Sequence, residues 1–317
     1  MSATLPTHND ELALVQPLLV CPGVQKAAST WIHRQLEAHP EVSCTTRKEI
    51  DFWGARYAKG HAWYAAQFPA PGERKLYADI TPAYFLDRTL PERLARDCPD
   101  ARVLVLLRDP YERTFSSYQH SLRSGDVRSD FATALQQVPE LLDYSRYASG
   151  LASYFRHFPR ERVKIMFTEA LEAEPRAALR ELYAFAGVNP DFVPPDMDKR
   201  VNVGQAYSRG RHALETVERF CKDRGLERKH LKRLGLDRLL DDLHGWFARR
   251  HRRPELPAEA RALLAPVLEP EIDALEQLLG MDFSAWRWSE GVRLSPADGA
   301  RAAQPSSPAQ ALGVHAS

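Results

Sequence analysis

Residues 18–31 read L-L-V-C-P-G-V-Q-K-A-A-S-T-W, and this stretch decides the fold class. An apolar run ends at Pro22 and Gly23, small residues follow, and an amphipathic helical pattern begins after a hydroxyl pair. The succession predicts a buried strand over 18–21, a tight turn, and a helix over 29–38. Because similar strands and helices alternate along the chain, we expect an α/β protein with a parallel sheet.

The turn between these two elements has the features of an anion-binding cradle. Its backbone N–H groups have no helical partner, and they lie at the positive end of the helix dipole. Lys26 adds a formal positive charge, and the hydroxyls of Ser29 and Thr30 add donors. The residues expected to hold the anion are Gly23, Gln25, Lys26, Ala27, Ala28, Ser29 and Thr30.

The loop is not a Walker A phosphate loop, which places a serine or threonine directly after the lysine to hold Mg²⁺. Here Lys26 is followed by Ala27 and Ala28, so the usual metal-binding hydroxyl is missing. The competing interpretation of this stretch alone is an ordinary strand-to-helix turn with an exposed lysine.

Residues 102–118, R-V-L-V-L-L-R-D-P-Y-E-R-T-F-S-S-Y, carry a second candidate anion site. The apolar run predicts a central parallel strand, which places Arg108 at the carboxyl edge of the sheet, where ligands bind in open α/β sheets. A helix follows, and Arg113 and Ser116 are three positions apart on it, so both can face one side. We therefore expect these three side chains to converge on a second anion. The competing interpretation is that the strand-end arginine pairs with neighbouring side chains.

These stretches resemble those of sulfotransferases that use 3′-phosphoadenosine 5′-phosphosulfate (PAPS). Residues 23–31 are similar to the family's 5′-phosphosulfate loop, G-x-x-K-x-G-T-T-x-L, and residues 108–118 to its 3′-phosphate element, R-D-P-x-x-R-x-x-S-x-Y. Three further segments resemble the glycan and heparan-type branch and its bacterial relatives: R-K-E-I-D-F-W (47–53), W-Y (63–64) and Y-A-D-I-T-P-A-Y-F (77–85).

The resemblance implies a P-loop-like three-layer fold, with a central parallel sheet flanked by helices. It implies sulfuryl transfer from PAPS, with 3′,5′-ADP as product and without a metal. Lys26 is expected to neutralise the charge that builds on the leaving phosphate, and Glu49 matches the position of the general base in the resembling branch. His61 and Asp79 are the alternative bases. Further nucleotide-binding residues implied by the resemblance are Arg108, Ser116, Arg209, Gly210 and Arg211. The implied acceptor-binding residues are Lys48, Trp53, His61, Asp79 and Tyr84.

Some positions depart from the family pattern. Ala28 stands where a glycine is usual, Ile80 stands where the heparan branch often has lysine, and Asp79 replaces a glutamate. The segment K-R-V-N-V-G-Q-A-Y-S-R-G-R (199–211) replaces the substrate loops of that branch. We therefore expect a bacterial enzyme that sulfates a carbohydrate or another small-molecule or natural-product hydroxyl, rather than a close heparan homologue.

Composition places the chain among globular proteins, with a formal net charge of +1. We expect a flexible N-terminus over 1–14, one sulfotransferase domain over 15–290 and a disordered tail over 291–317. The four scattered cysteines indicate reduced thiols, and neither a signal peptide nor a membrane-spanning run is visible in the sequence. These features predict a cytoplasmic protein.

The basic segment over 209–253 is interpreted either as a solvated helical face or as a docking surface for a sulfated glycan or an acidic carrier protein. Nucleic acid and membrane are not expected as partners. Two other functions stay open: a P-loop nucleotide kinase-like phosphotransferase, and a non-catalytic nucleotide-binding protein that docks a carrier. Thermal stabilisation by 3′,5′-ADP, compared with ATP and Mg²⁺, distinguishes the three.

Overall fold

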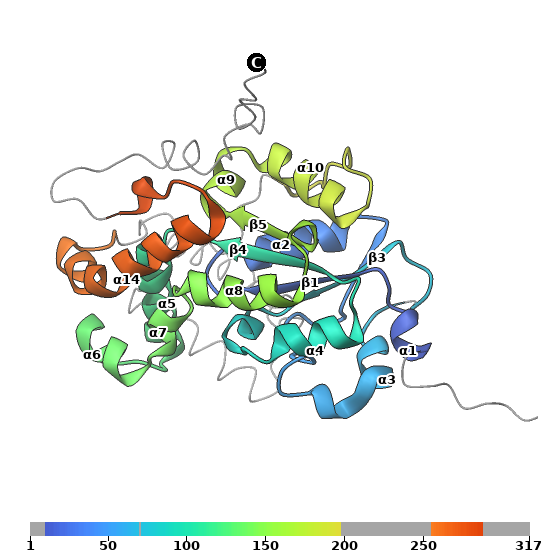
Figure 1. Cartoon of the computed structure of the whole chain (residues 1–317), viewed down its shortest axis with the longest axis horizontal. Helices are drawn as coiled ribbons and strands as arrows, with labels where there is room; N and C mark the ends of the chain where they lie inside the picture. The colour runs from blue at the N-terminus through green and yellow to red at the C-terminus, as the bar shows by residue number, and fades with distance from the viewer. Residues whose placement is uncertain (1–9, 70, 198–254, 288–317) are drawn as a thin grey trace, which may run out of the picture.

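A five-stranded parallel sheet forms the centre of the protein. The computed structural model describes residues 10–69, 71–197 and 255–287 of the 317-residue chain. The strand order is β2-β3-β1-β4-β5, and every neighbouring pair is parallel. The strands are β1 (Leu18–Gly23), β2 (Val42–Cys44), β3 (Leu76–Ile80), β4 (Arg102–Leu107) and β5 (Val163–Phe167). The predicted fold class, a P-loop-like fold with a central parallel sheet flanked by helices, is confirmed (Figure 1).

Helices cover both faces of this sheet. The longer ones are α2 (Ser29–Ala38), α4 (Leu90–Asp97), α5 (Pro110–Ser124), α8 (Tyr147–His157), α10 (Pro175–Ala186) and α14 (Ala258–Leu279). The shorter ones are α1 (Asp10–Ala13), α3 (Gly60–Ala65), α6 (Phe131–Gln137), α7 (Glu140–Asp143) and α9 (Thr168–Ala173), with 3₁₀ turns η1 (Tyr57–Lys59), η2 (Pro82–Leu86), η3 (Arg160–Arg162) and η4 (Ser284–Trp286). Helices α4 and α8 pack together on one face, and α2 and α10 lie on the other (Figure 1). Helix α1 is a structured element within the segment expected to be flexible, and its Leu12 is buried.

The two central strands are apolar because both of their faces are covered. Every residue of β1 is buried, as is β4 from Val103 to Leu107. Such strands appear in the sequence as continuous apolar runs rather than as alternating patterns. The strand predicted over 18–21 is therefore confirmed, and it extends to Gly23 because this residue pairs with Val105 of β4.

The turn between β4 and α5 is fixed from several sides. Asp109 caps α5 by accepting hydrogen bonds from the backbone amides of Tyr111 at 2.8 Å and of Glu112 at 3.2 Å. Pro110 occupies the first helical position, which suits a residue without an N–H. The hydroxyl of Tyr147 on α8 donates to the backbone carbonyl of Arg108 at 2.8 Å. The end of β4 is thus held both by α5, which follows it, and by α8.

Asp79 on β3 is a carboxylate buried in the core. It accepts hydrogen bonds from Thr81 Oγ1 at 2.7 Å, from the Tyr84 hydroxyl at 3.0 Å and from the Tyr64 hydroxyl at 3.4 Å. Burial raises the pKa of Asp79 to about 6, although the three hydroxyl donors act in the opposite direction. The side chain therefore ties β3 to η2 and α3.

Helix α8 approaches η2 so closely that a side chain has no room at Gly150. A Cβ atom added there would lie 2.3 Å from the ring of Phe85 and 2.7 Å from the guanidinium of Arg88. The same turn lies against the end of β1, because a Cβ at Gly23 would lie 2.9 Å from the carbonyl oxygen of Pro82. Close packing of α8 on η2 therefore supports the loop that follows β1.

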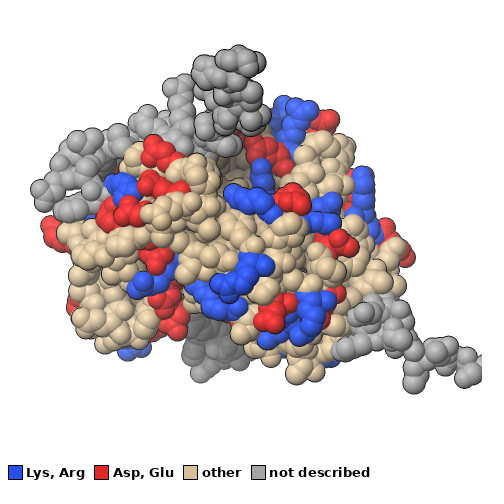
Figure 2. Space-filling model, viewed as in Figure 1, with Lys and Arg blue, Asp and Glu red and all other residues tan. Residues whose placement is uncertain are grey.

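Charged side chains of both signs are interspersed over the face shown in Figure 2. Among the described residues, no helix combines the length and apolarity needed to cross a membrane.

Replacing Asp79 with Asn should remove part of the pH dependence of stability. Because the pKa of Asp79 is raised from its ordinary value of 3.8 to about 6, folding favours the protonated form. The stability that this group contributes is complete below pH 3.8 and is lost as the pH rises through 6. We expect a loss on the order of 2–3 kcal/mol in the wild type over this window, and little from this position in Asp79→Asn. Urea unfolding of the wild type and of Asp79→Asn at the two ends of this pH window gives the change in the free energy of unfolding for each protein. Equal changes in the two proteins would contradict this account.

Gly150→Ala should destabilise the fold through overpacking, by about 1–3 kcal/mol. The matched control is Arg156→Ala, an exposed position on the same helix, which should change the free energy of unfolding by less than about 0.5 kcal/mol. Urea denaturation of the three proteins tests this. A Gly150→Ala protein as stable as the wild type would mean that α8 does not approach η2 as described.

Candidate active site

The loop between β1 and α2 forms a concave backbone surface. Lys26 and Ala28 have φ angles of 68° and 64°, in the left-handed region that side chains other than glycine seldom adopt. Within the described residues no side chain caps α2, and the first helical bond runs from the Trp31 amide to the Ala28 carbonyl at 2.9 Å. The amides that precede Trp31 have no helical acceptor. Left-handed residues in such a turn direct successive amides to one side, which makes an anion-binding nest.

At the start of this loop, position 23 requires a glycine for steric reasons. Its φ is +143°, and a Cβ atom there would lie 2.9 Å from the Pro82 carbonyl oxygen and 3.0 Å from the Phe85 Cβ. The next amide, of Val24, donates to the Leu106 carbonyl of β4 at 2.8 Å. The start of the loop is therefore bonded to β4 and lies against η2 before the chain turns into α2.

Lys26 lies in a cationic environment. Burial, together with the positive charges of Arg123 and Arg113, lowers the pKa of its ammonium to about 8. A bound anion would offset these costs, because it supplies the opposite charge that the surroundings lack. The electrostatics of the loop therefore favour a negatively charged ligand.

The Lys48–Glu49 pair connects this loop to the segment after β2. The Lys48 ammonium lies 2.6 Å from Glu49 Oε1, 3.3 Å from Thr30 Oγ1 and 3.5 Å from Ser29 Oγ. The Glu49 side chain is 55% exposed, and its backbone amide donates to the Ile80 carbonyl at 3.3 Å. The structure thus brings the predicted base and the predicted donor loop together, with a lysine between them.

Arg108 brings the second candidate anion site to the same place. One Nη of its largely buried guanidinium donates to the Lys26 carbonyl at 3.4 Å, and the other lies 3.5 Å from Glu112 Oε2. Ser116 is half-buried on α5, two turns further along. The two sequence elements predicted to bind anions therefore adjoin each other at the carboxyl edge of the sheet, the edge where α/β proteins bind ligands.

The prediction for Arg113 needs correction. Its guanidinium is fully buried, and it donates to Ser145 Oγ, to Thr114 Oγ1 and to the Leu141 carbonyl. It therefore ties α5 to the segment around α7 and does not converge with Ser116 on an exposed anion. Spacing on a helix correctly places two residues near one side but does not say which of them the neighbouring helices cover.

Four predicted acceptor contacts are core residues, and this corrects their role. Trp53, His61, Asp79 and Tyr84 are each at most 4% exposed. The Tyr84 hydroxyl accepts from the Trp53 amide at 3.1 Å and donates to Asp79, while His61 Nε2 lies 3.2 Å from Asp97 Oδ2. Buried side chains whose polar atoms are engaged in this way stabilise the wall behind the site. His61 and Asp79 are for the same reason poor alternatives for the general base.

Two α5 side chains near Lys26 were missed by the sequence analysis. His120 and Arg123 follow Ser116 at four and seven positions, a spacing that places all three along one helix face. Arg123 is the strongest positive charge acting on the pKa of Lys26. Partial burial lowers the pKa of His120, and the charges of Lys26 and Arg123 lower it further. The helical spacing was the signal that could have identified them.

The remaining predicted residues form two groups. Ala27 is buried, and the Gln25 amide donates to the Tyr144 hydroxyl at 3.2 Å, so this side chain points toward α7. Arg209, Gly210 and Arg211 lie outside the described residues. No cluster of three or more potential metal ligands is found in the described part of the chain, and the absence of a metal stays a prediction.

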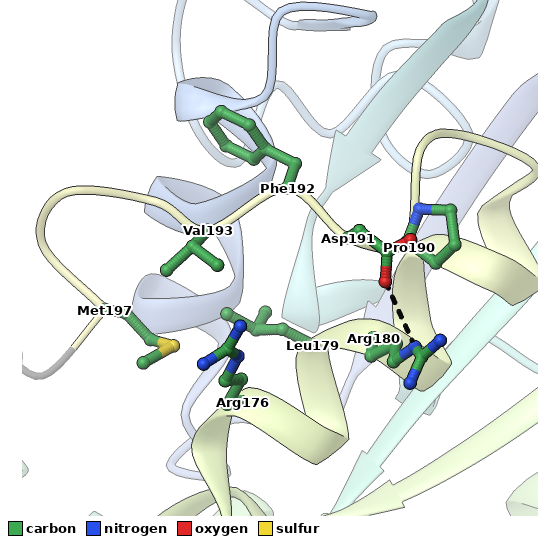
Figure 3. A pocket seen from close by; sticks show the side chains of 8 residues that line it. All are labelled: Arg176, Leu179, Arg180, Pro190, Asp191, Phe192, Val193 and Met197. Carbon is green, nitrogen blue, oxygen red and sulfur yellow. Dashed lines mark ion pairs between the residues drawn. The ribbon is translucent and has the colours of Figure 1, made fainter.

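A separate surface pocket lies between the first half of α10 and the segment 190–197 that follows this helix, and no predicted site residue lines it. Figure 3 shows its lining: Arg176, Leu179, Arg180, Pro190, Asp191, Phe192, Val193 and Met197. Arg180 is already paired with Asp191, at 3.4 Å. None of the residues predicted to bind donor or acceptor lines it, so we do not assign the chemistry to this pocket.

The chain is similar to known sulfotransferases. A family model described as "Sulfotransferase family" matches residues 46–191. Mouse heparan sulfate glucosamine 3-O-sulfotransferase 3A1 (Mus musculus) is 30% identical over 194 residues, covering 58% of this chain and 49% of that protein. Mouse bifunctional heparan sulfate N-deacetylase/N-sulfotransferase 2 is 29% identical over 196 residues, covering 55% and 22%. The chain thus spans half or less of the length of these relatives.

Among solved structures, a sulfotransferase from Alicyclobacillus acidocaldarius aligns with a TM-score of 0.62 at 21% identity. The alignment covers 86% of this chain and 98% of that one, and it supports the fold. Residues 46–191 thus match the sulfotransferase family, and the fold of the described residues is similar to that of a solved sulfotransferase.

Proposed function

We propose that this protein transfers the sulfuryl group of PAPS to a hydroxyl of a carbohydrate acceptor. The observation that carries the proposal is the position of the Lys48 ammonium between Glu49 and the hydroxyls of Ser29 and Thr30. This contact places an exposed carboxylate beside an anion-binding loop, as in-line transfer between a bound donor and an incoming hydroxyl requires.

The residues present fit a nucleotide with phosphate groups at the 5′ and 3′ positions of its ribose. The loop amides and Lys26 offer one cationic site, which suits a 5′-phosphosulfate. Arg108, at the end of the neighbouring strand, offers a second site for a 3′-phosphate. A kinase-like reaction is less well supported, because Lys26 is followed by Ala27, a buried residue without a hydroxyl for Mg²⁺.

The chemistry needs a base on one side of the sulfur and a positive charge on the other. Glu49 would accept the proton of the acceptor hydroxyl while the hydroxyl oxygen bonds to sulfur. The bond between sulfur and the phosphate oxygen of the donor would break at the same time. Lys26 stabilises the negative charge that develops on that phosphate oxygen. Lys48 holds Glu49 next to the loop, and in-line transfer would need the base and the leaving group on opposite sides of the transferred group.

A carbohydrate acceptor is favoured by the relatives. The names of both mouse proteins describe sulfotransferases of heparan sulfate, and the family model matches the segment that carries Glu49. Ile80, at the end of β3, has a buried apolar side chain, so this position offers the acceptor no charge and no exposed contact. We therefore propose a sugar hydroxyl as the reacting group, with a hydroxylated natural product as the variant that an acceptor screen tests.

Arg108→Ala should weaken nucleotide binding selectively. In the presence of EDTA, the wild type is expected to bind 3′,5′-ADP, because no step of the proposed binding uses a metal. Loss of a charge-assisted hydrogen bond worth about 1.5–3 kcal/mol should lower the affinity for 3′,5′-ADP about 10- to 100-fold. The affinity for 5′-AMP, which lacks the 3′-phosphate, should change less than about twofold. Isothermal calorimetry measures both, with the exposed Arg176→Ala as control. Equal losses for the two nucleotides would place Arg108 away from the 3′-phosphate.

Glu49→Gln should abolish most turnover and leave donor binding intact. General-base assistance typically contributes about 10²–10⁴-fold, so we expect a decrease in this range. The assay follows radiolabelled sulfate from PAPS into heparan sulfate oligosaccharides, while calorimetry with 3′,5′-ADP confirms the site. Lys26→Ala should lose both turnover and nucleotide affinity. A Glu49→Gln variant that works at a near-normal rate would move the base to another group, and His120 is the next side chain to replace.

A further inference from the structure

Glu112 lies between two arginines that come from different parts of the chain. Its Oε2 is 3.5 Å from Nη2 of Arg108, and its Oε1 is 3.3 Å from Nη2 of Arg261. The Glu112 side chain is 31% exposed and that of Arg261 is 26% exposed, whereas that of Arg108 is only 10% exposed. One carboxylate is thus shared by the arginine proposed to bind the 3′-phosphate and by an arginine of α14.

Helix α14 is attached to the first turn of α5 by further contacts. The Tyr111 hydroxyl donates to Glu269 Oε1 at 2.6 Å, and the guanidinium of Arg261 lies over the ring of Tyr111 at 5.4 Å. Arg261 also lies 3.9 Å from Asp109 Oδ2, the cap of α5. These contacts fix the positive charge of Arg261 beside Glu112 instead of leaving it on a freely moving side chain.

We propose that Glu112 and Arg261 act as an opposed pair that sets the affinity of Arg108 for a phosphate group on the nucleotide ribose. Glu112 lowers this affinity, and Arg261 partly restores it. This inference rests on the proposed function, and it assigns specificity-determining roles to two residues that do not themselves hold the donor.

The signs follow from the charges. In the free protein Glu112 competes for the guanidinium of Arg108, so a phosphate must share Arg108 with a carboxylate. Once the phosphate is bound, the same carboxylate is a nearby like charge and repels it. Arg261 draws Glu112 toward itself through the other carboxylate oxygen and compensates part of its charge. Because both pairs are only partly buried, each effect is modest and is screened by salt.

The competing role is a positioning one, in which Glu112 holds Arg108 in the orientation that a phosphate needs. The two roles predict opposite signs. If Glu112 competes with the phosphate, E112Q binds 3′,5′-ADP more tightly; if Glu112 orients Arg108, E112Q binds it more weakly.

Isothermal calorimetry of E112Q, R261Q and the double variant with 3′,5′-ADP and 5′-AMP tests the proposal. For 3′,5′-ADP we expect E112Q to bind roughly threefold more tightly and R261Q roughly threefold more weakly than the wild type. Because Arg261 acts through Glu112, R261Q should have a smaller effect when Glu112 is already Gln. For 5′-AMP the affinities should stay close to the wild-type value. The gain in E112Q should shrink as the salt concentration rises, which a purely structural effect would not produce.

Asp100→Asn is the matched control. It removes one carboxylate from another arginine pair, with Arg162 at 2.8 Å, at the opposite end of β4. It should leave both nucleotide affinities unchanged. Thermal melting of each variant checks the fold, and E112Q alone decides the sign if loss of the Asp109 contact destabilises R261Q.

The outcomes separate this proposal from the proposed function. A wild type that does not bind 3′,5′-ADP refutes the proposed donor, and with it this inference. A wild type that binds, together with an E112Q variant whose affinity is equal to or weaker than wild type, leaves the donor assignment intact and overturns the opposed pair. Equal gains for 3′,5′-ADP and 5′-AMP overturn it too, because the effect would then not act on the ribose phosphate.

Discussion

The pairing of β1 with β4 is the constraint on which the candidate site depends. Both strands are buried on both faces, so polar groups are left at their carboxyl ends. The Val24 amide donates to the Leu106 carbonyl, and the Arg108 guanidinium donates to the Lys26 carbonyl. The loop after one strand and the arginine after the other are therefore held as one unit. This pairing therefore brings the two candidate anion sites to one edge of the sheet.

Concentrating positive charge at this edge has a cost that a ligand can offset. Burial and the charges of Arg123 and Arg113 lower the pKa of Lys26 to about 8, so its charged form is less stable than that of an exposed lysine, although it still predominates at neutral pH. A bound anion would offset that penalty. Perturbed titration of this kind is common where a protein is arranged for binding or catalysis rather than for stability. Neighbouring carboxylates moderate this positive field, because Glu49 acts on Lys26 and Glu112 pairs with Arg108.

The sequence predicted the strand, loop and helix around Lys26, and the α/β fold, because these depend on local apolar runs and helix-start signals. It predicted the neighbourhood of Arg108 for the same reason. It was wrong for Arg113, because a helical spacing does not reveal which face α7 and its neighbours cover. It was also wrong for Trp53 and Tyr84, whose motif order says nothing about burial. Those outcomes depend on packing between segments far apart in the chain.

The two halves of the site differ in how firmly the core fixes them. The donor half consists of backbone amides next to buried strands and of a largely buried arginine, so the core fixes its position. The acceptor half rests on Glu49, an exposed residue with a φ of 62°, held by Lys48 and by one backbone bond to Ile80. Surface segments of this kind change sequence without changing the fold. This difference explains why the residues of the chain identify a donor class more sharply than an acceptor.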